Sequence, residues 1–298
     1  MKIINLNLYT LIDVLSYLHS NDVYAYIETC MCFYNVVDYI KKACLKNGKI
    51  YKIARPSTYH ISSSIKMIEW AKIHPNFVFS QKLARNVTRS DNLYSLKYLK
   101  KHNCVFCPEM YCDAINNDNI KIIKWLFKKG VELNEYAFHE AAKGGNIYIL
   151  KLLKKYNCEY NSVTCNNAII YQNLDCLKWL LKNGCFIDTF SFAYAVETGN
   201  LNIIEYLYDI CTHDLSFPWR HSNCCTLAAK KGYIDVLIWL RTRYISWNID
   251  TILVAIENNN YNIAKWAVEN GCYISRSLYT HLCSLIHINE SMNIKFID

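Results

Sequence analysis

The chain has 298 residues and a formal net charge of +8, and its 52% hydrophobic content excludes an intrinsically disordered protein. No run of about 18 apolar residues occurs, which excludes a transmembrane helix, and the N-terminal stretch lacks a small-residue cleavage site, so no secretory signal is expected. The 15 cysteines are odd in number, and we therefore expect reduced thiols in a cytoplasmic protein rather than a disulfide scaffold.

The first predicted element is a helical head at residues 8–37. Its leucines and valines share one helical face, and Asn21-Asp22 can cap a second helix, which continues through Cys30. This pattern resembles an F-box, although Leu8 stands where that family has proline. The alternative is that residues 1–48 only cap the following array. The resemblance implies that six side chains dock on the adaptor subunit of a cullin-type ubiquitin ligase: Leu8, Leu11, Val14, Leu15, Leu18 and Phe33.

Most of the positive charge lies in residues 41–101, where fourteen Lys and Arg face only Glu69 and Asp91. The first forty residues sum to −3 and residues 102–298 to −1. A basic segment of this kind suits contact with nucleic acid or another polyanion, whereas solvation of a long surface is the alternative. We favour solvation for the lysines of 102–298, and polyanion contact stays open for 41–101.

From about residue 50 the sequence repeats itself, mostly every 27 residues. The phrase NIKIIKWLFKKG at 119–130, for example, returns as NLDCLKWLLKNG at 173–184. The residues that open the copies, which we call anchors, are Tyr59, Val87, Ala114, Ala141, Ala168, Ala195, Ala228 and Ala255. The residue eleven after each anchor is aromatic in every copy except one, which has leucine. We call this set the aromatic register: Trp70, Tyr98, Trp125, Leu152, Trp179, Tyr206, Trp239 and Trp266.

Each copy is predicted to form a short helix, a tight turn, a longer helix and a loop. Glycines recur four or sixteen residues after an anchor, where a helix C-cap needs positive φ. Small anchors let helices approach closely, and the aromatic register is predicted to be core, since one buried ring removes roughly 150–250 Å² from water. A single helix pair cannot bury its own apolar face, so neighbouring copies are expected to stack.

The copy at 137–161 resembles an ankyrin repeat. Its FHEAA at 138–142 is similar to the family's Leu-His-x-Ala-Ala core, and its GNI at 145–147 to the Gly-His/Asn-Leu turn. The family's usual period is 33 residues, and the shorter period here resembles ankyrin arrays of large DNA viruses, with loops in place of hairpin fingers. The resemblance implies a non-enzymatic interaction protein in the cytoplasm, that of the host cell if the protein is viral, with packaging in virions as the alternative.

Cysteine and histidine positions favour packing over chemistry. Cys104 and Cys107 form a C-x-x-C, which could bind zinc. However, three cysteines share the position of Cys104, seventeen after an anchor, and have no such partner: Cys158, Cys185 and Cys272. By the ankyrin resemblance, His139 holds backbone groups between neighbouring repeats. No phosphate loop or nucleophile–base pair is present, so no enzyme, metal or cofactor is predicted.

One copy is longer, because Ala195 and Ala228 are 33 residues apart. The extra residues lie in CTHDLSFPWRHSN at 211–223. Three side chains of this loop are candidates for partner contact: Phe217, Trp219 and Arg220. The alternative is that the loop fills the groove occupied by the finger in other copies.

The sequence therefore predicts an all-α, ankyrin-type helical repeat solenoid. We expect a head at 1–48, an array of about eight repeats at 49–298, and a C-terminal cap at 276–298. The predicted function is that of a monomer whose array holds a target protein and whose head links it to the ligase. The alternative is a structural or virion-associated scaffold.

Overall fold

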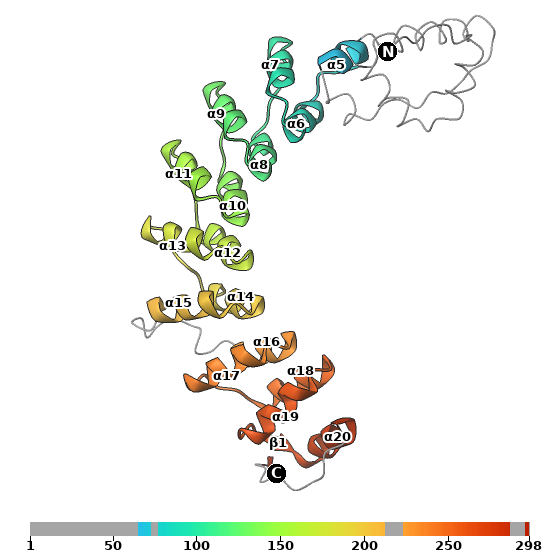
Figure 1. The fold of residues 1–298 in the computed structure, drawn as a ribbon, viewed down its shortest axis with the longest axis vertical. Coiled ribbons are helices and arrows are strands. Elements are labelled where there is room, and N and C mark those ends of the chain that lie inside the picture. The colour runs from blue at the N-terminus through green and yellow to red at the C-terminus, as the bar shows by residue number, and fades with distance from the viewer. Residues whose placement is uncertain (1–64, 73–76, 212–222, 287–295, 298) are drawn as a thin grey trace, which may run out of the picture. The chain divides into compact units, whose positions relative to one another are not determined.

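The computed structural model describes residues 65–72, 77–211, 223–286 and 296–297. The chain forms two compact units, which divide between Glu132 and Leu133, and each is considered by itself. The described residues of both form paired helices (Figure 1). The predicted boundary between head and array at residue 48 lies outside the described residues, as do the side chains of the predicted docking face.

The described part of the first unit contains five helices: α5 (Ile65–Lys72), α6 (Gln81–Arg89), α7 (Leu93–Lys101), α8 (Glu109–Asn116) and α9 (Ile120–Lys128). Helices α6 and α8 carry anchors and are called inner helices, whereas α5, α7 and α9 are called outer helices. The inner helices α6 and α8 pack on each other, and each packs on the outer helix that follows it.

The second unit continues the alternation. Its inner helices are α10 (Glu135–Gly144), α12 (Ser162–Ile170), α14 (Ser191–Thr198), α16 (Cys224–Lys231) and α18 (Ile249–Glu257). Its outer helices are α11 (Ile147–Lys155), α13 (Leu174–Lys182), α15 (Leu201–Cys211), α17 (Ile234–Thr242) and α19 (Tyr261–Glu269). Each inner helix packs on the next inner helix, which gives a continuous stack of inner helices along the unit (Figure 1). This arrangement confirms the predicted all-α helical repeat solenoid.

The anchors lie at the contacts between inner helices. Every anchor in the described residues is fully buried: Val87, Ala114, Ala141, Ala168, Ala195, Ala228 and Ala255. Packed helices lie about 8–10 Å apart, and the lower end of that range requires small side chains at the contact. The small anchors are therefore what lets successive inner helices pack directly on one another.

Helix ends follow the two predicted positions. Gly145, Gly199 and Gly232, four residues after an anchor, cap α10, α14 and α16 in the left-handed conformation, as predicted. The glycines sixteen after an anchor also have positive φ, but they lie one residue beyond the C-cap, as Gly271 does after Asn270. Copies without glycine force another residue into this conformation, and Tyr244 is the bulkiest of them.

The predicted difference in helix length holds only in the repeats that begin with α8, α14 and α16, where the outer helix is the longer one. The inner helices have between 8 and 10 residues and the outer helices between 8 and 11. Both helices bury one stripe against their neighbours, so both need about two turns. The segments joining each outer helix to the next inner helix in the described residues are mostly loops, as expected from the shortened period.

The aromatic register is less buried than predicted. Trp239 is 8% exposed, but Trp125, Trp179 and Trp266 are only half-buried. Successive residues of a helix are rotated by about 100° about its axis. The aromatic register therefore lies at the edge of the buried stripe of each outer helix, beside the neighbouring outer helix. The contacts agree with this position: Trp239 Nε1 donates to Glu205 Oε1 of α15 at 2.9 Å. The rings therefore lie at the edge of the core, where Trp239 joins two successive outer helices.

At the C-terminus, α20 (Arg276–Ile286) packs on α19. Strand β1 (Ile274–Ser275) pairs in parallel with β2 (Phe296–Ile297). The predicted capping turn thus contains a helix. A role of 276–298 as a cap stays a prediction.

Candidate functional site

Three apolar side chains occupy the same position of consecutive repeats in the second unit. Tyr136, Val163 and Phe190 each lie five residues before an anchor, at the start of α10, α12 and α14, and are 60%, 46% and 64% exposed. Because α10 packs on α12 and α12 on α14, these side chains line up across the three helices. We call them the apolar row.

Helix geometry explains why the row faces solvent. The two residues that follow each member are buried, as Ala137 and Phe138 are after Tyr136, and a step of one residue turns the helix by about 100°. Aromatic neighbours support two members of the row. The ring of Tyr136 meets His139 edge-on at 5.7 Å, and the ring of Phe190 lies 6.5 Å from that of Tyr194.

A hydrogen-bond network fixes α12 against α10 behind the row. Asn161 caps α12 by accepting from the Val163 backbone N–H at 3.0 Å, and its amide donates to Glu135 Oε2 at 2.8 Å. The same Asn161 oxygen is 3.2 Å from His139 Nε2. The partner of His139 is therefore the side chain of the next repeat's N-cap residue, whereas the ankyrin resemblance had implied backbone groups.

A second network fixes α14 against α12. Asn166 donates to Asp188 Oδ2 at 2.8 Å, and the Ser191 hydroxyl donates to Asn166 Oδ1 at 2.6 Å. Asp188 also accepts from the Phe190 backbone N–H at 2.9 Å. Burial alone would raise the pKa of the Asp188 carboxyl, but these hydrogen bonds outweigh burial and lower it. The carboxylate thus orders the start of α14, where Phe190 lies.

Four carboxylates lie on the helices of the apolar row or directly before one of them. Glu135 and Glu140 lie on α10, Asp188 precedes α14, and Glu197 lies near its end. Lys143 is the one lysine on these three inner helices, which carry no arginine, and its Nζ lies 3.6 Å from Glu140 Oε2. The face therefore combines exposed apolar side chains with negative charge, and it suits a partner that offers apolar and basic groups.

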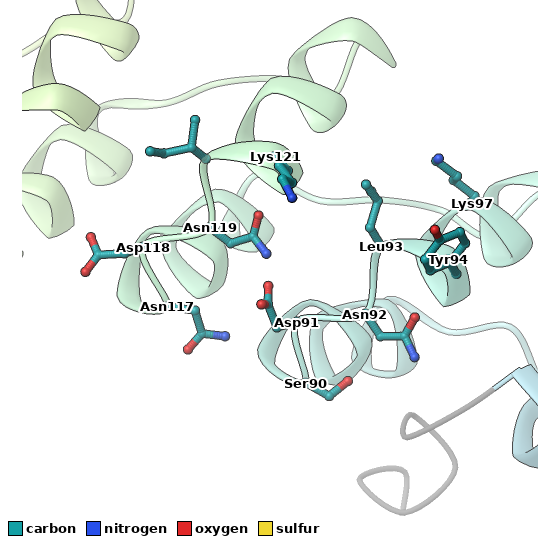
Figure 2. A pocket seen from close by; sticks show the side chains of 11 residues that line it. Ser90, Asp91, Asn92, Leu93, Tyr94, Lys97, Asn117, Asp118, Asn119 and Lys121 are labelled. Atoms are coloured by element: carbon teal, nitrogen blue, oxygen red, sulfur yellow. The ribbon is translucent and has the colours of Figure 1, made fainter.

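Figure 2 shows a cavity of the first unit, between the turn from α6 to α7 and the turn from α8 to α9; its volume is about 700 Å³. Most of the residues that line it are polar, including Asn92, Asn119 and Lys97. The two asparagines are engaged as helix caps, since Asn92 accepts from Ser95 N at 3.0 Å and Asn119 from Ile122 N at 2.8 Å. The lining thus stabilises helix starts and offers no nucleophile–base pair.

Part of the predicted basic segment is neutralised within the protein. Arg85 and Arg89 both bind Asp113, a buried carboxylate of the next inner helix, at 2.7 Å and 2.8 Å. The hydrogen bond to Asp113 raises the pKa of the Arg85 guanidinium. These two arginines therefore serve the stacking of α6 on α8, while Lys97, Lys100 and Lys101 stay exposed.

The recurring cysteines sit at one structural position. All four are buried, and each sulfur lies against the carbonyl of the residue that precedes the inner helix of its own repeat, as Cys158 does with Asn134 O at 3.2 Å. Burial raises the pKa of Cys104 and of Cys272 to about 11, so these thiols are protonated. Within the described ranges, no group of three or more His, Cys, Asp and Glu is arranged to hold a metal.

None of the predicted partner-binding residues lies in the described part of the chain. The docking face of the head, from Leu8 to Phe33, falls outside it, and so do Phe217, Trp219 and Arg220. The apolar row, in contrast, was missed by the sequence analysis. Its signal was available, because the position five before the anchor holds Tyr, Val and Phe in three successive copies.

Comparison with known proteins supports the repeat assignment. Residues 111–191 match a family model described as ankyrin repeats (3 copies), so this part of the chain is similar to ankyrin repeats, which are generic protein–protein interaction modules. A crystal structure of the human ASB11 ankyrin repeat domain aligns with a TM-score of 0.42 and 17% identity over 62% of this chain and 86% of that chain. Among curated proteins, none matches the sequence.

Among the described residues, no helix is both long and apolar enough to cross a bilayer.

Proposed function

We propose that this protein is a non-enzymatic recognition protein that binds a target protein through the inner helices of its second unit. The observation that carries the proposal is the apolar row, in which Tyr136, Val163 and Phe190 are exposed on three consecutive helices. Large apolar side chains gathered on one face favour a protein interface, because their burial stabilises a complex. The networks of Asn161 and Asp188 support this role, since they hold the row rigid before binding.

The test compares matched tyrosines of one repeat. Tyr136→Ser removes a member of the row, whereas Tyr148→Ser removes a tyrosine that is 53% exposed on the outer helix α11. Proteins recovered with the wild-type chain from cells should be depleted with Tyr136→Ser and retained with Tyr148→Ser. Equal recovery with both variants, at unchanged circular dichroism, would remove the row from the interface.

We further propose that the head joins the target to a host cullin-type ubiquitin ligase. The support is the F-box-like pattern of residues 8–37, with Leu11 and Leu15 on the docking face. The full chain should bind the purified adaptor subunit, and Leu11→Asp with Leu15→Asp should abolish binding without changing the Tyr136-dependent recovery. Absence of adaptor binding by a folded wild-type chain would leave residues 1–48 as a cap.

The loop at 211–223 is proposed to add contacts to the target. Aromatic and arginine side chains are the usual hot spots of interfaces, and this loop offers Phe217, Trp219 and Arg220. Trp219→Ala should weaken target recovery if the loop makes contact, and it should lower stability instead if the loop fills a groove.

A polyanion contact is a second candidate, favoured by the exposed Lys97, Lys100 and Lys101. Salt-dependent binding of the full chain to DNA would support it, and binding that is absent at low salt would exclude it. The third candidate is a structural or virion-associated scaffold. High copy number in purified particles, together with no Tyr136-dependent partner, would favour that role over target recognition.

A further inference from the structure

Two free thiols meet in the buried part of one repeat. The sulfur of Cys165 on α12 lies 2.8 Å from that of Cys185, which follows α13. Cys165 is fully buried and Cys185 is 7% exposed. The Cys165 thiol donates to Cys185, and Cys185 in turn donates to Asn161 O at 3.1 Å, so both side chains are held in place.

The pair is specific to this repeat among the described copies. Cys165 lies three residues before its anchor, and the same position holds Ala84, Phe138 and Ile252 in the copies that share the position of Cys185. In the copy with anchor Ala228, Cys225 lies against the carbonyl of Ile245, the residue that stands at the position of Cys185. Repeat packing therefore accounts for a cysteine at the position of Cys185, but it does not require one opposite it.

We propose that Cys165 and Cys185 are an oxidation site that closes to an intrachain disulfide when the protein meets a peroxide. A disulfide joins its sulfurs at about 2.05 Å, so closure requires an approach of only about 0.8 Å from the present separation. Both side chains come from one repeat and are separated along the chain by α13 and the turn on either side of it, so the disulfide would link two parts of the same repeat.

The reaction balances with hydrogen peroxide as oxidant. Cys185 is the only member of the pair with any exposure, and the hydrogen bond from Cys165 lowers the pKa of its thiol. The Cys185 thiolate attacks one peroxide oxygen, which forms a sulfenic acid and releases hydroxide. The Cys165 sulfur then attacks the Cys185 sulfur, the S–O bond breaks, and the oxygen leaves as water with the Cys165 proton. Two thiols and one peroxide thus give one disulfide and two waters.

Closure would tie α12 to the loop that precedes α14. That loop carries Asp188, whose carboxylate accepts from the Phe190 backbone N–H. The disulfide would therefore restrict the segment at the start of α14, although its formation does not depend on the proposed recognition function.

The experiment treats the full wild-type chain with hydrogen peroxide under native conditions, blocks the remaining thiols, and maps peptides without reduction. Trypsin places Cys165 in residues 156–178 and Cys185 in residues 183–220. We expect these two peptides to be joined, with fragment spectra placing the bond at Cys165 and Cys185, and to separate on reduction. A bond placed at another cysteine, separate peptides with Cys185 as a sulfinic acid, or unchanged thiols would each overturn the proposal.

Variants provide the matched control. Cys165→Ala should leave Cys185 to accumulate sulfenic and sulfinic acid, because no resolving thiol is present. Cys158→Ala removes the equivalent thiol of the preceding repeat, and the cross-link should form as in the wild type. If Cys165→Ala fails to fold, as judged by circular dichroism, the wild-type peptide map still decides the question.

Discussion

The conformation of Tyr244 gives a quantitative test of how this array ends its outer helices. Tyr244 has a φ of +60° and is 91% exposed to solvent. A left-handed conformation destabilises the folded state by about 1–2 kcal/mol for an L-residue, and glycine avoids this cost. Glycine instead gives up more backbone entropy on folding than other residues, which costs about 0.5–1 kcal/mol. Tyr244→Gly should therefore raise the free energy of unfolding by about 0.5–1 kcal/mol, even though a large side chain is removed.

Two control variants separate backbone conformation from the loss of a side chain. Gly271 takes the same position in its copy, with φ of +86°, and an added Cβ would meet nothing within 4 Å. Gly271→Ala should thus cost about 1 kcal/mol through conformation alone. Tyr273, which is 54% exposed and has no positive φ, controls for removing an exposed tyrosine, and Tyr273→Gly should not stabilise.

The assay is urea unfolding followed by circular dichroism, with the slope of each transition compared first, because repeat arrays can unfold in parts. At equal slope, the midpoint should rise for Tyr244→Gly and fall for Gly271→Ala. A lower midpoint for Tyr244→Gly, or no change for Gly271→Ala, would refute the conformational reasoning.

Three further predictions concern the contacts between repeats. Asn173 donates to the carbonyls of Ala142 and Lys143 at 2.9 Å and 2.8 Å and so caps α10, the inner helix of the preceding repeat; Asn173→Ala should cost about 1–3 kcal/mol in urea unfolding. Ala168 is fully buried, and Ala168→Leu should cost at least about 1–3 kcal/mol by overpacking, measured as a lower thermal midpoint. Since the pKa of Asp188 is lowered by folding, its contribution to stability is complete above the unfolded-state pKa of about 4 and is lost as pH falls through that value and then the folded-state pKa. The stability of Asp188→Asn should therefore change less than that of the wild type between about pH 5 and pH 3, and an identical pH profile would contradict the role of this carboxylate.

Several elements could be predicted from the sequence because they depend on local chemistry repeated at a fixed period. The anchors, the capping glycines and the buried cysteines each recur at one position, and a residue type that recurs by position is under the same packing constraint in every copy. The burial of the aromatic register was predicted wrongly because it depends on packing and not on the period. Its period was clear, but the period does not say on which side of the buried stripe Trp125 or Trp179 lies.

The exposure of the apolar row and the contact between the two thiols illustrate what sequence reasoning could not supply. Phe190 is one position from buried Ser191, and only the rotation of α14 in its stack decides which of them meets solvent. Likewise, Cys165 and Cys185 are separated by a helix and two turns, so their contact depends on how α13 folds back beside α12.

By itself the sequence determined the helical period, the small residues between inner helices and the left-handed positions where helices end, because these follow from backbone geometry and side-chain size. The tertiary structure decided which side chains stay exposed on the inner helices, which polar groups join one repeat to the next, and which thiols meet. Those outcomes depend on the angle and spacing at which separate helices pack, and these quantities are set by all the contacts of the stack together.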